Sequence, residues 1–171
     1  MPQNVQVGSV TASFCNVRLP IGLVLDRIEI EGQDAELHTD PLHLELPEPG
    51  NVRVFVGAES LEKYLNEQAP GGLRDFQVRL VPGAIEVQAT ARVIVELRAT
   101  ATCKLRIEHG RELHVELMSV DVLGGSAKSL VESQLDKINP ILDAREYPVQ
   151  LELHSVEITS EAVIVTGTLA P

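Results

Sequence analysis

Tryptophan is absent from this chain of 171 residues, and aromatic residues make up only 3% of it. Side chains that stack on bases or sugars are therefore scarce. Positive charge is scarce as well, because 14 Lys and Arg stand against 25 Asp and Glu, for a net charge of −11. Phosphate backbones repel such an acidic chain on average. We therefore expect no nucleic-acid partner and a core built from Val, Leu and Ile.

Cysteine is nearly absent, and the spacing of Cys15 and Cys103 matches no metal motif. We expect both to be buried as small hydrophobic residues, and a single disulfide between them is the alternative. No stretch approaches the roughly 20 apolar residues of a membrane span, and the first residues lack the pattern of a secretion signal. The localisation stays open: the cytoplasm, or the cell envelope if a leader has been removed.

Catalytic motifs are also missing. The sequence contains no G-x-S-x-G, no H-E-x-x-H, no phosphate-binding loop and no dinucleotide fingerprint. We therefore expect a protein that is not an enzyme and uses no cofactor.

The densest polar cluster is His38, Asp40 and His43, with Glu45 nearby. Imidazole and carboxylate groups together can bind Zn²⁺. However, Asp40-Pro41 interrupts the expected strand, and alternation with leucines places His43 on a solvated face. We expect an exposed polar edge without a metal, and a hydrolase or metal enzyme built on this cluster is the catalytic alternative. The other histidines, His109, His114 and His154, are expected on the surface.

Two further polar segments are interpreted as ordinary loops. Gly124-Gly125 precedes an expected helix and could receive an anion on free backbone N–H groups, but a tight turn explains both glycines. Asp143, Arg145 and Glu146 form a short charged segment, which we expect to be solvated.

What the chain does have is a long alternating segment. From Ile85 to Ile107 every odd-numbered residue is apolar and every even-numbered one except Ile94 is polar, which is typical of a strand with one buried face. A straight strand of this length would reach about 76 Å, so the segment must bend or fold back. Because Ala99–Thr102 contains no turn-forming residue, we expect strong curvature or a bulge there and no clean hairpin. The alanines leave a shallow apolar wall, which a helix or a ligand must fill.

Other strands and two helices follow from the same kind of pattern. Helices are expected over Glu59–Ala69, ended by Pro70-Gly71-Gly72, and from Ser126 to Ile138, ended by Asn139-Pro140. Strands are expected at Val5–Phe14, Val17–Leu25, Ile28–Leu37, Leu42–Leu46, Val52–Val56, Phe76–Val81, Leu113–Leu117, Val149–Leu153 and Ala162–Leu169.

These elements fall into two similar units, at about residues 50–100 and 118–171. An offset of 70 aligns Leu61 with Val131 and Pro70 with Pro140. An internal duplication and shared folding physics would each account for the match. We predict one α+β domain over residues 1–171, in which a long, strongly curved antiparallel sheet wraps around two amphipathic helices.

The C-terminal third contains a set of segments defined by small, apolar and proline positions: Val120-Asp121-Val122, Ala127–Ile138, Asn139-Pro140-Ile141-Leu142, Tyr147-Pro148-Val149 and Val163–Gly167. In these segments the chain resembles the LmeA-like phospholipid-binding family of bacterial envelope proteins. Ala58–Pro70 and Val78–Ala91 are also similar, which extends the resemblance over about residues 50–170. The resemblance implies association with membrane lipids and a fold like half of a tubular lipid-binding domain.

We therefore predict that the chain binds a phospholipid or another acyl-chain ligand in an apolar groove without catalysis, for lipid transfer or envelope maintenance. The expected lining residues, which could equally be plain core, are Leu61, Leu65, Ala89, Ala91, Val93, Val95, Leu97, Ala99, Ala101, Leu130, Leu135 and Ile138. Peripheral membrane contact and a homodimer are compatible with this interpretation. The alternative is a structural or adaptor module that binds a protein through a sheet edge and holds no ligand.

Overall fold

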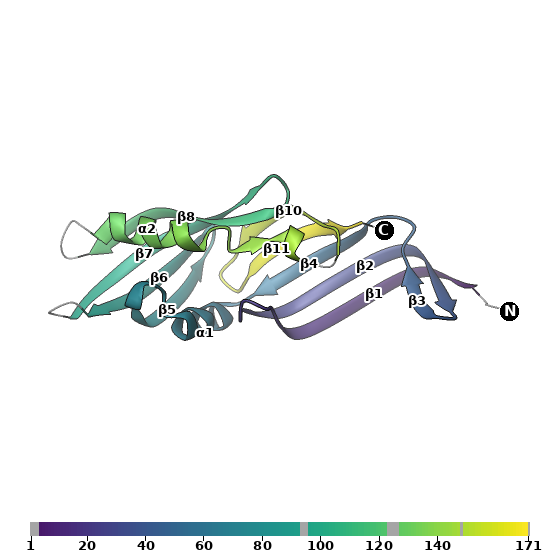
Figure 1. Cartoon of the computed structure of the whole chain (residues 1–171), viewed down its shortest axis with the longest axis horizontal. Coiled ribbons are helices and arrows are strands. Elements are labelled where there is room, and N and C mark those ends of the chain that lie inside the picture. Colours follow the sequence, from purple (N-terminus) through teal and green to yellow (C-terminus); the bar gives the residue numbers. More distant parts are fainter. Residues whose placement is uncertain (1–3, 93–95, 123–126, 148, 171) are drawn as a thin grey trace.

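The computed structural model describes residues 4–92, 96–122, 127–147 and 149–170. It is an α+β fold of antiparallel strands and two helices, as predicted, drawn out along one axis (Figure 1). The first sheet has the order β1-β2-β4-β11-β10, with β3 paired to β2, and contains β1 (Asn4–Arg18), β2 (Val24–Thr39), β3 (Leu42–Glu45), β4 (Gly50–Val56), β10 (Leu151–Ile158) and β11 (Val163–Leu169). The second has the order β5-β6-β7-β8-β9 and contains β5 (Arg74–Val81), β6 (Ala84–Arg92), β7 (Glu96–Glu108), β8 (Glu112–Val122) and β9 (Leu142–Asp143).

The two sheets meet at β10. The N–H of Gly83, in the β5–β6 turn, donates to the carbonyl of Ile158, and the N–H of Leu153 donates to the carbonyl of Gly110, in the β7–β8 turn. Two hairpin ends of the second sheet therefore cap the free edge of β10. A core cluster crosses this junction and contains Leu80, Ile85, Ile158 and Val163. The sheets thus form one strongly curved wall (Figure 1).

The core is thin for a chain of this size. The accessible surface is 10790 Å², whereas a compact protein of 18.6 kDa exposes about 8,200 Å². Among the described residues, no large side chain is completely buried. Much apolar surface is therefore only half covered.

The alternating segment folds back as a hairpin of β6 and β7, and the predicted site of the bend is wrong. The reversal lies between Arg92 and Glu96, which pair directly, and not at Ala99–Thr102. Odd-numbered residues pair with odd-numbered ones, as Ala89 does with Ala99. A connection with an odd number of residues keeps the alternation intact, so the sequence pattern does not show the turn. A bulge does occur beside Thr102, but its extra residue is in β8.

At the N-terminus the predicted strand Val17–Leu25 is wrong, because it spans the turn between β1 and β2. Gly32-Gln33-Asp34 lies inside β2, as the predicted strand Ile28–Leu37 requires. Asn16 and Asp34 have φ of 55° and 50°. At both positions the alternation shifts by one residue, so that the apolar residues are even-numbered just before it and odd-numbered just after it. Val17 and Leu25 consequently pack with Ile28 in one cluster.

The helices are α1 (Ala58–Gln68) and α2 (Ala127–Ile138), close to the predicted ranges. The left-handed Ala69 ends α1 and its N–H donates to the carbonyl of Leu65. Two 3-10 turns, η1 (Pro70–Gly72) and η2 (Ala144–Glu146), follow the helices. Among the described residues, no helix is long and apolar enough to span a bilayer. The duplication of the two units stays a prediction.

Candidate functional site

The small residues of β6 and β7 form one patch, as the alternation predicted. Ala89 pairs with Ala99, Val87 with Ala101, and Ala91 with Leu97. Directly paired residues lie on the same face of a sheet. We call Ala89, Ala91, Ala99 and Ala101 the alanine floor. Ala89 is buried and the other three are half-buried.

A helix stands at each side of this floor, and an asparagine fixes each one. Asn66 of α1 donates to the carbonyl of Phe76 in β5 at 3.0 Å and accepts from its N–H at 2.9 Å. Asn139, directly after α2, makes the same two bonds with Val115 in β8, at 2.8 and 2.9 Å. Since β5 and β8 flank β6 and β7, the two helices border the floor on opposite sides (Figure 1).

The predicted helix residues differ in their surroundings. Leu61 packs against both core clusters, Leu65 and Leu135 are half-buried, and Ile138 is 41% exposed. The predicted lining residues Val93 and Val95, and the side chain of Leu130, lie outside the described residues. Gly124-Gly125 lies outside them too. Leu97 is half-buried on β7.

A second apolar surface, which the sequence reasoning missed, lies on the first sheet. Its central row runs across five strands through direct cross-strand pairs, and consists of Phe14, Ile28, Val54, Val165 and Val156. The next row consists of Ala12, Ile30, Val52, Gly167 and Leu153. We call these two rows the open apolar face. The alternation of apolar residues in β1 and β2, with its one-residue shifts at Asn16 and Asp34, could have indicated the part of this face on those two strands.

Coverage of the open apolar face falls from β10 towards β1. Leu153 is buried, Val54 and Ile28 are half-buried, and Phe14 is 51% exposed. Figure 1 shows that β1 and β2 extend well beyond α1. Val156 and Val165 pack against the same cluster as Val87, the neighbour of Ala101. The open apolar face therefore continues into the alanine floor.

The opposite face of the first sheet is polar. Arg53 forms an ion pair with Glu29 at 2.9 Å, and the Arg27 guanidinium lies 4.2 Å from the centre of the Phe55 ring. The hydroxyls of Ser155 and Thr166 are 2.6 Å apart. Such exposed pairs contribute little to stability, but they keep this face in water and leave the other face for apolar contacts.

The charged segment at η2 is held by its own ion pairs. Arg145 donates hydrogen bonds to Asp143 and to Glu112. The hydrogen bonds from Arg145 lower the pKa of Asp143 to about 2. The positive charge of Arg145 is thus matched by the carboxylates of Asp143 and Glu112, in line with the expectation of a solvated loop.

The cysteines and histidines depart in part from expectation. Burial raises the pKa of Cys103 to about 11, as expected for a buried thiol, but Cys15 is exposed on β1 and the prediction for it is wrong. Both are free, so the disulfide alternative is wrong too. His109 and His154 are exposed, whereas His114 is half-buried between Glu108 and Glu112.

Comparison with protein families settles the relationship. The model of the LmeA-like phospholipid-binding family matches residues 2–168. The chain belongs to this family. The LmeA-like match includes β1 to β3, where the sequence resemblance had not reached, so the open apolar face lies within the matched residues. No curated protein and no solved structure matches the chain.

Proposed function

We propose that the chain binds the acyl chains of a phospholipid along the open apolar face and over the alanine floor, without catalysis. The observation that carries this proposal is the row from Phe14 to Val156, in which five apolar side chains cross the sheet: four of them are half-buried and Phe14, on β1, is 51% exposed. Membership of a phospholipid-binding family supports the ligand class.

The size of the face suits an acyl chain. Five neighbouring strands, about 4.8 Å apart, span about 19 Å. One layer of acyl chains fills about 15 Å, half of the hydrocarbon core of a bilayer. A single acyl chain can therefore lie across the open apolar face, and the long β1 and β2 leave room for a second one beside it.

Burial of hydrocarbon supplies the binding free energy. Each methylene removed from water contributes about 0.8 kcal/mol, so a dozen methylenes contribute about 10 kcal/mol before the cost of ordering the ligand is subtracted. This mechanism needs no charged partner for the acyl chain, and the two rows of the open apolar face contain no charged residue.

The first test compares two neighbouring residues on opposite faces of β1. Phe14→Glu places a carboxylate on the open apolar face, and Ser13→Glu places the same charge on the polar face. Both positions are exposed, so both variants should fold. We expect Phe14→Glu to bind a phospholipid with a fluorescent acyl chain at least about 10-fold more weakly, because desolvating the carboxylate costs several kcal/mol, and Ser13→Glu to bind like the wild type. Equal affinities would overturn the assignment of the face.

The second test addresses the alanine floor in the same way. Ala99→Phe fills the floor, whereas Thr100→Phe adds the same ring on the opposite face of β7. We expect the first variant alone to reduce the amount of lipid that organic extraction and mass spectrometry recover from protein purified without detergent. No lipid from the wild type, together with no binding of the fluorescent phospholipid, would favour the adaptor alternative.

A further inference from the structure

Two histidines and a glutamate meet at the far end of the first sheet, in the hairpin of β2 and β3. His38 pairs directly with His43, and Glu36 pairs with Glu45. Alternate residues of a strand share a face, so these four side chains lie together, and Leu37 and Leu44 lie on the other face. The sequence analysis expected the Asp40-Pro41 interruption to prevent a site. Instead, it is part of the turn that brings His43 back to His38.

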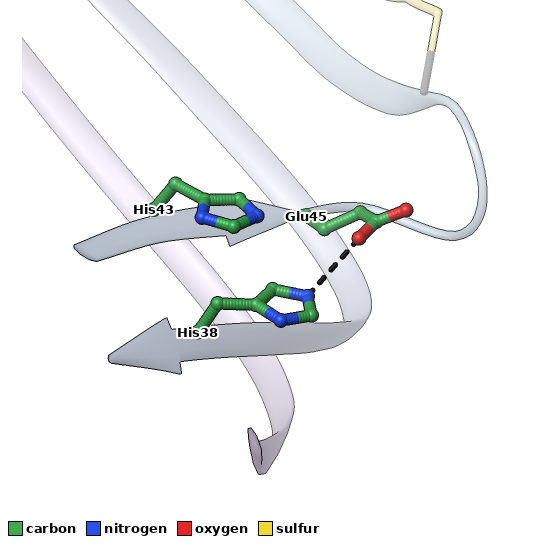
Figure 2. Close-up of side chains that lie close together, drawn as sticks. All are labelled: His38, His43 and Glu45. Carbon is green, nitrogen blue, oxygen red and sulfur yellow. Dashed lines mark hydrogen bonds and ion pairs between the residues drawn. The ribbon is translucent and has the colours of Figure 1, made fainter. Parts of the chain in front are cut away.

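The side-chain atoms converge (Figure 2). His38 Nε2 lies 3.0 Å from a carboxylate oxygen of Glu45, and because a carboxylate only accepts, this nitrogen carries the proton that a bound metal ion would replace. The two imidazole rings are stacked, with centres 4.3 Å apart and planes 3° from parallel. One possible ligand atom from each of His38, His43 and Glu45 lies within 4.8 Å of the others. Asp40 is not in this group.

Nε2 of His43 is oriented for metal binding by the hydrogen bond that the other ring nitrogen makes. His43 Nδ1 lies 2.9 Å from the carbonyl oxygen of Pro41, and because a carbonyl only accepts, Nδ1 carries the proton. The lone pair is therefore on Nε2, which Figure 2 shows on the side of Glu45. A backbone carbonyl that orients a histidine in this way is typical of metal sites.

We propose that His38, His43 and Glu45 bind a divalent transition-metal ion, with Zn²⁺ as the expected occupant. Two imidazole nitrogens and one carboxylate are a common zinc ligand set, which leaves the fourth position to water. Ligand atoms around tetrahedral zinc are about 3.3 Å apart, given bonds of about 2.0 to 2.1 Å. His43 and Glu45 are exposed, so their side chains are free to rotate to this spacing, and the two parallel rings must tilt so that both Nε2 lone pairs point at one ion.

Binding would add a cross-link to the short hairpin of β2 and β3. β3 has four residues and pairs with β2, and its other face carries Leu42, which is 76% exposed. An ion shared by His38 on β2 and His43 on β3 cross-links the hairpin. The metal therefore fixes the position of the exposed leucines at the end of the open apolar face.

The experiment measures binding of ZnCl₂ by calorimetry, after the full chain has been stripped with a chelator. We expect one Zn²⁺ per chain, and at least about 10-fold weaker binding in His43→Ala and in Glu45→Gln, because losing even an outer-sphere partner costs that much. His154→Ala, which removes an exposed histidine from β10, should bind like the wild type. Added zinc should also slow hydrogen exchange of the β3 amides.

Two outcomes would overturn the proposal. One is the absence of stoichiometric zinc binding by the wild type. The other is binding that survives in His43→Ala but is lost in His109→Ala, which would place the ion at the cluster of Glu108, His109 and Glu112. The circular dichroism spectrum and melting temperature of each variant show that it is folded. Lipid binding is measured separately, so failure here leaves the acyl-chain proposal unaffected.

Discussion

The two sheets have the same alternating pattern, but only one of them has its apolar face bordered by helices on both sides. In the second sheet α1 and α2 flank the alanine floor, and each is fixed by an asparagine that bonds to the backbone of a flanking strand, β5 or β8. In the first sheet, Phe14 at the β1 edge is 51% exposed. Alternation therefore predicts which face of a strand is apolar, but not whether the chain itself covers that face.

The largest effect on stability should separate the junction of the two sheets from the open β1 edge of the first sheet. Ile158 is buried in the cluster that joins the sheets, so Ile158→Ala should lower the free energy of unfolding by about 2 to 4 kcal/mol. Phe14→Ala removes a larger side chain from the open apolar face, yet should cost less than about 1 kcal/mol, because half of the ring is already in water. Urea denaturation of both variants provides the measurement. Similar losses would show that the β1 edge is packed as well as the junction.

The next effect concerns the asparagines that hold the helices. Asn66→Ala leaves the backbone N–H and carbonyl of Phe76 in β5 without their partner, and Asn139→Ala does the same to Val115 in β8. Each change should cost about 1 to 3 kcal/mol. The amides of Phe76 and Val115, respectively, should then exchange faster with solvent. Asn51→Ala, at an exposed position on β4, is the matched control. Unchanged exchange in the two variants would mean that packing alone holds the helices.

Sequence analysis could predict the elements that depend on local chemistry. The end of α1 before Pro70-Gly71-Gly72 and the start of the break after α2 at Asn139-Pro140 were visible, because proline and glycine act on the adjacent backbone. The apolar face of β6 and β7 was also visible, because successive side chains of a strand point to opposite faces of the sheet. The hairpin between them was not, because its odd-numbered connection preserves the alternation.

What could not be predicted depends on pairing between distant residues. The open apolar face requires β4 to lie between β2 and β11, a neighbourhood that no local pattern indicates. The histidine cluster depends on the register that places His38 opposite His43. Cys15 is exposed because its pairing with Arg27 places it on the polar face of the outer strand β1, and its apolar neighbours could not reveal that.

A smaller effect on stability is expected where a residue of the first sheet caps α1, the helix that borders the second sheet. Asp26 of β2 accepts a hydrogen bond from the N–H of Gly57 at 2.6 Å and another from the hydroxyl of Ser60. It therefore caps the start of α1 from another element. Asp26→Ala should lower the free energy of unfolding by about 1 kcal/mol, as for the loss of an N-cap.

Thermal unfolding of Asp26→Ala, compared with Glu59→Ala in the exposed first turn of α1, tests this link. The Asp26 variant should be the less stable of the two. If Glu59→Ala lowers the melting temperature as much, the loss of negative charge near the N-terminus of α1 explains the effect, and the hydrogen bonds from Gly57 and Ser60 to Asp26 do not.

The smallest expected effect is the pH dependence of the Asp143–Arg145 pair, at the outer strand β9 of the second sheet. Because its folded pKa of about 2 lies below the ordinary value of about 3.9, Asp143 adds stability above pH 4, and this contribution is lost as the pH falls towards 2. The difference in melting temperature between the wild type and Asp143→Asn should therefore be a small one at pH 5 and shrink towards zero near pH 2. A difference that stays constant over this range would mean that the asparagine changes local packing and that the ion pair contributes nothing, as many exposed pairs do.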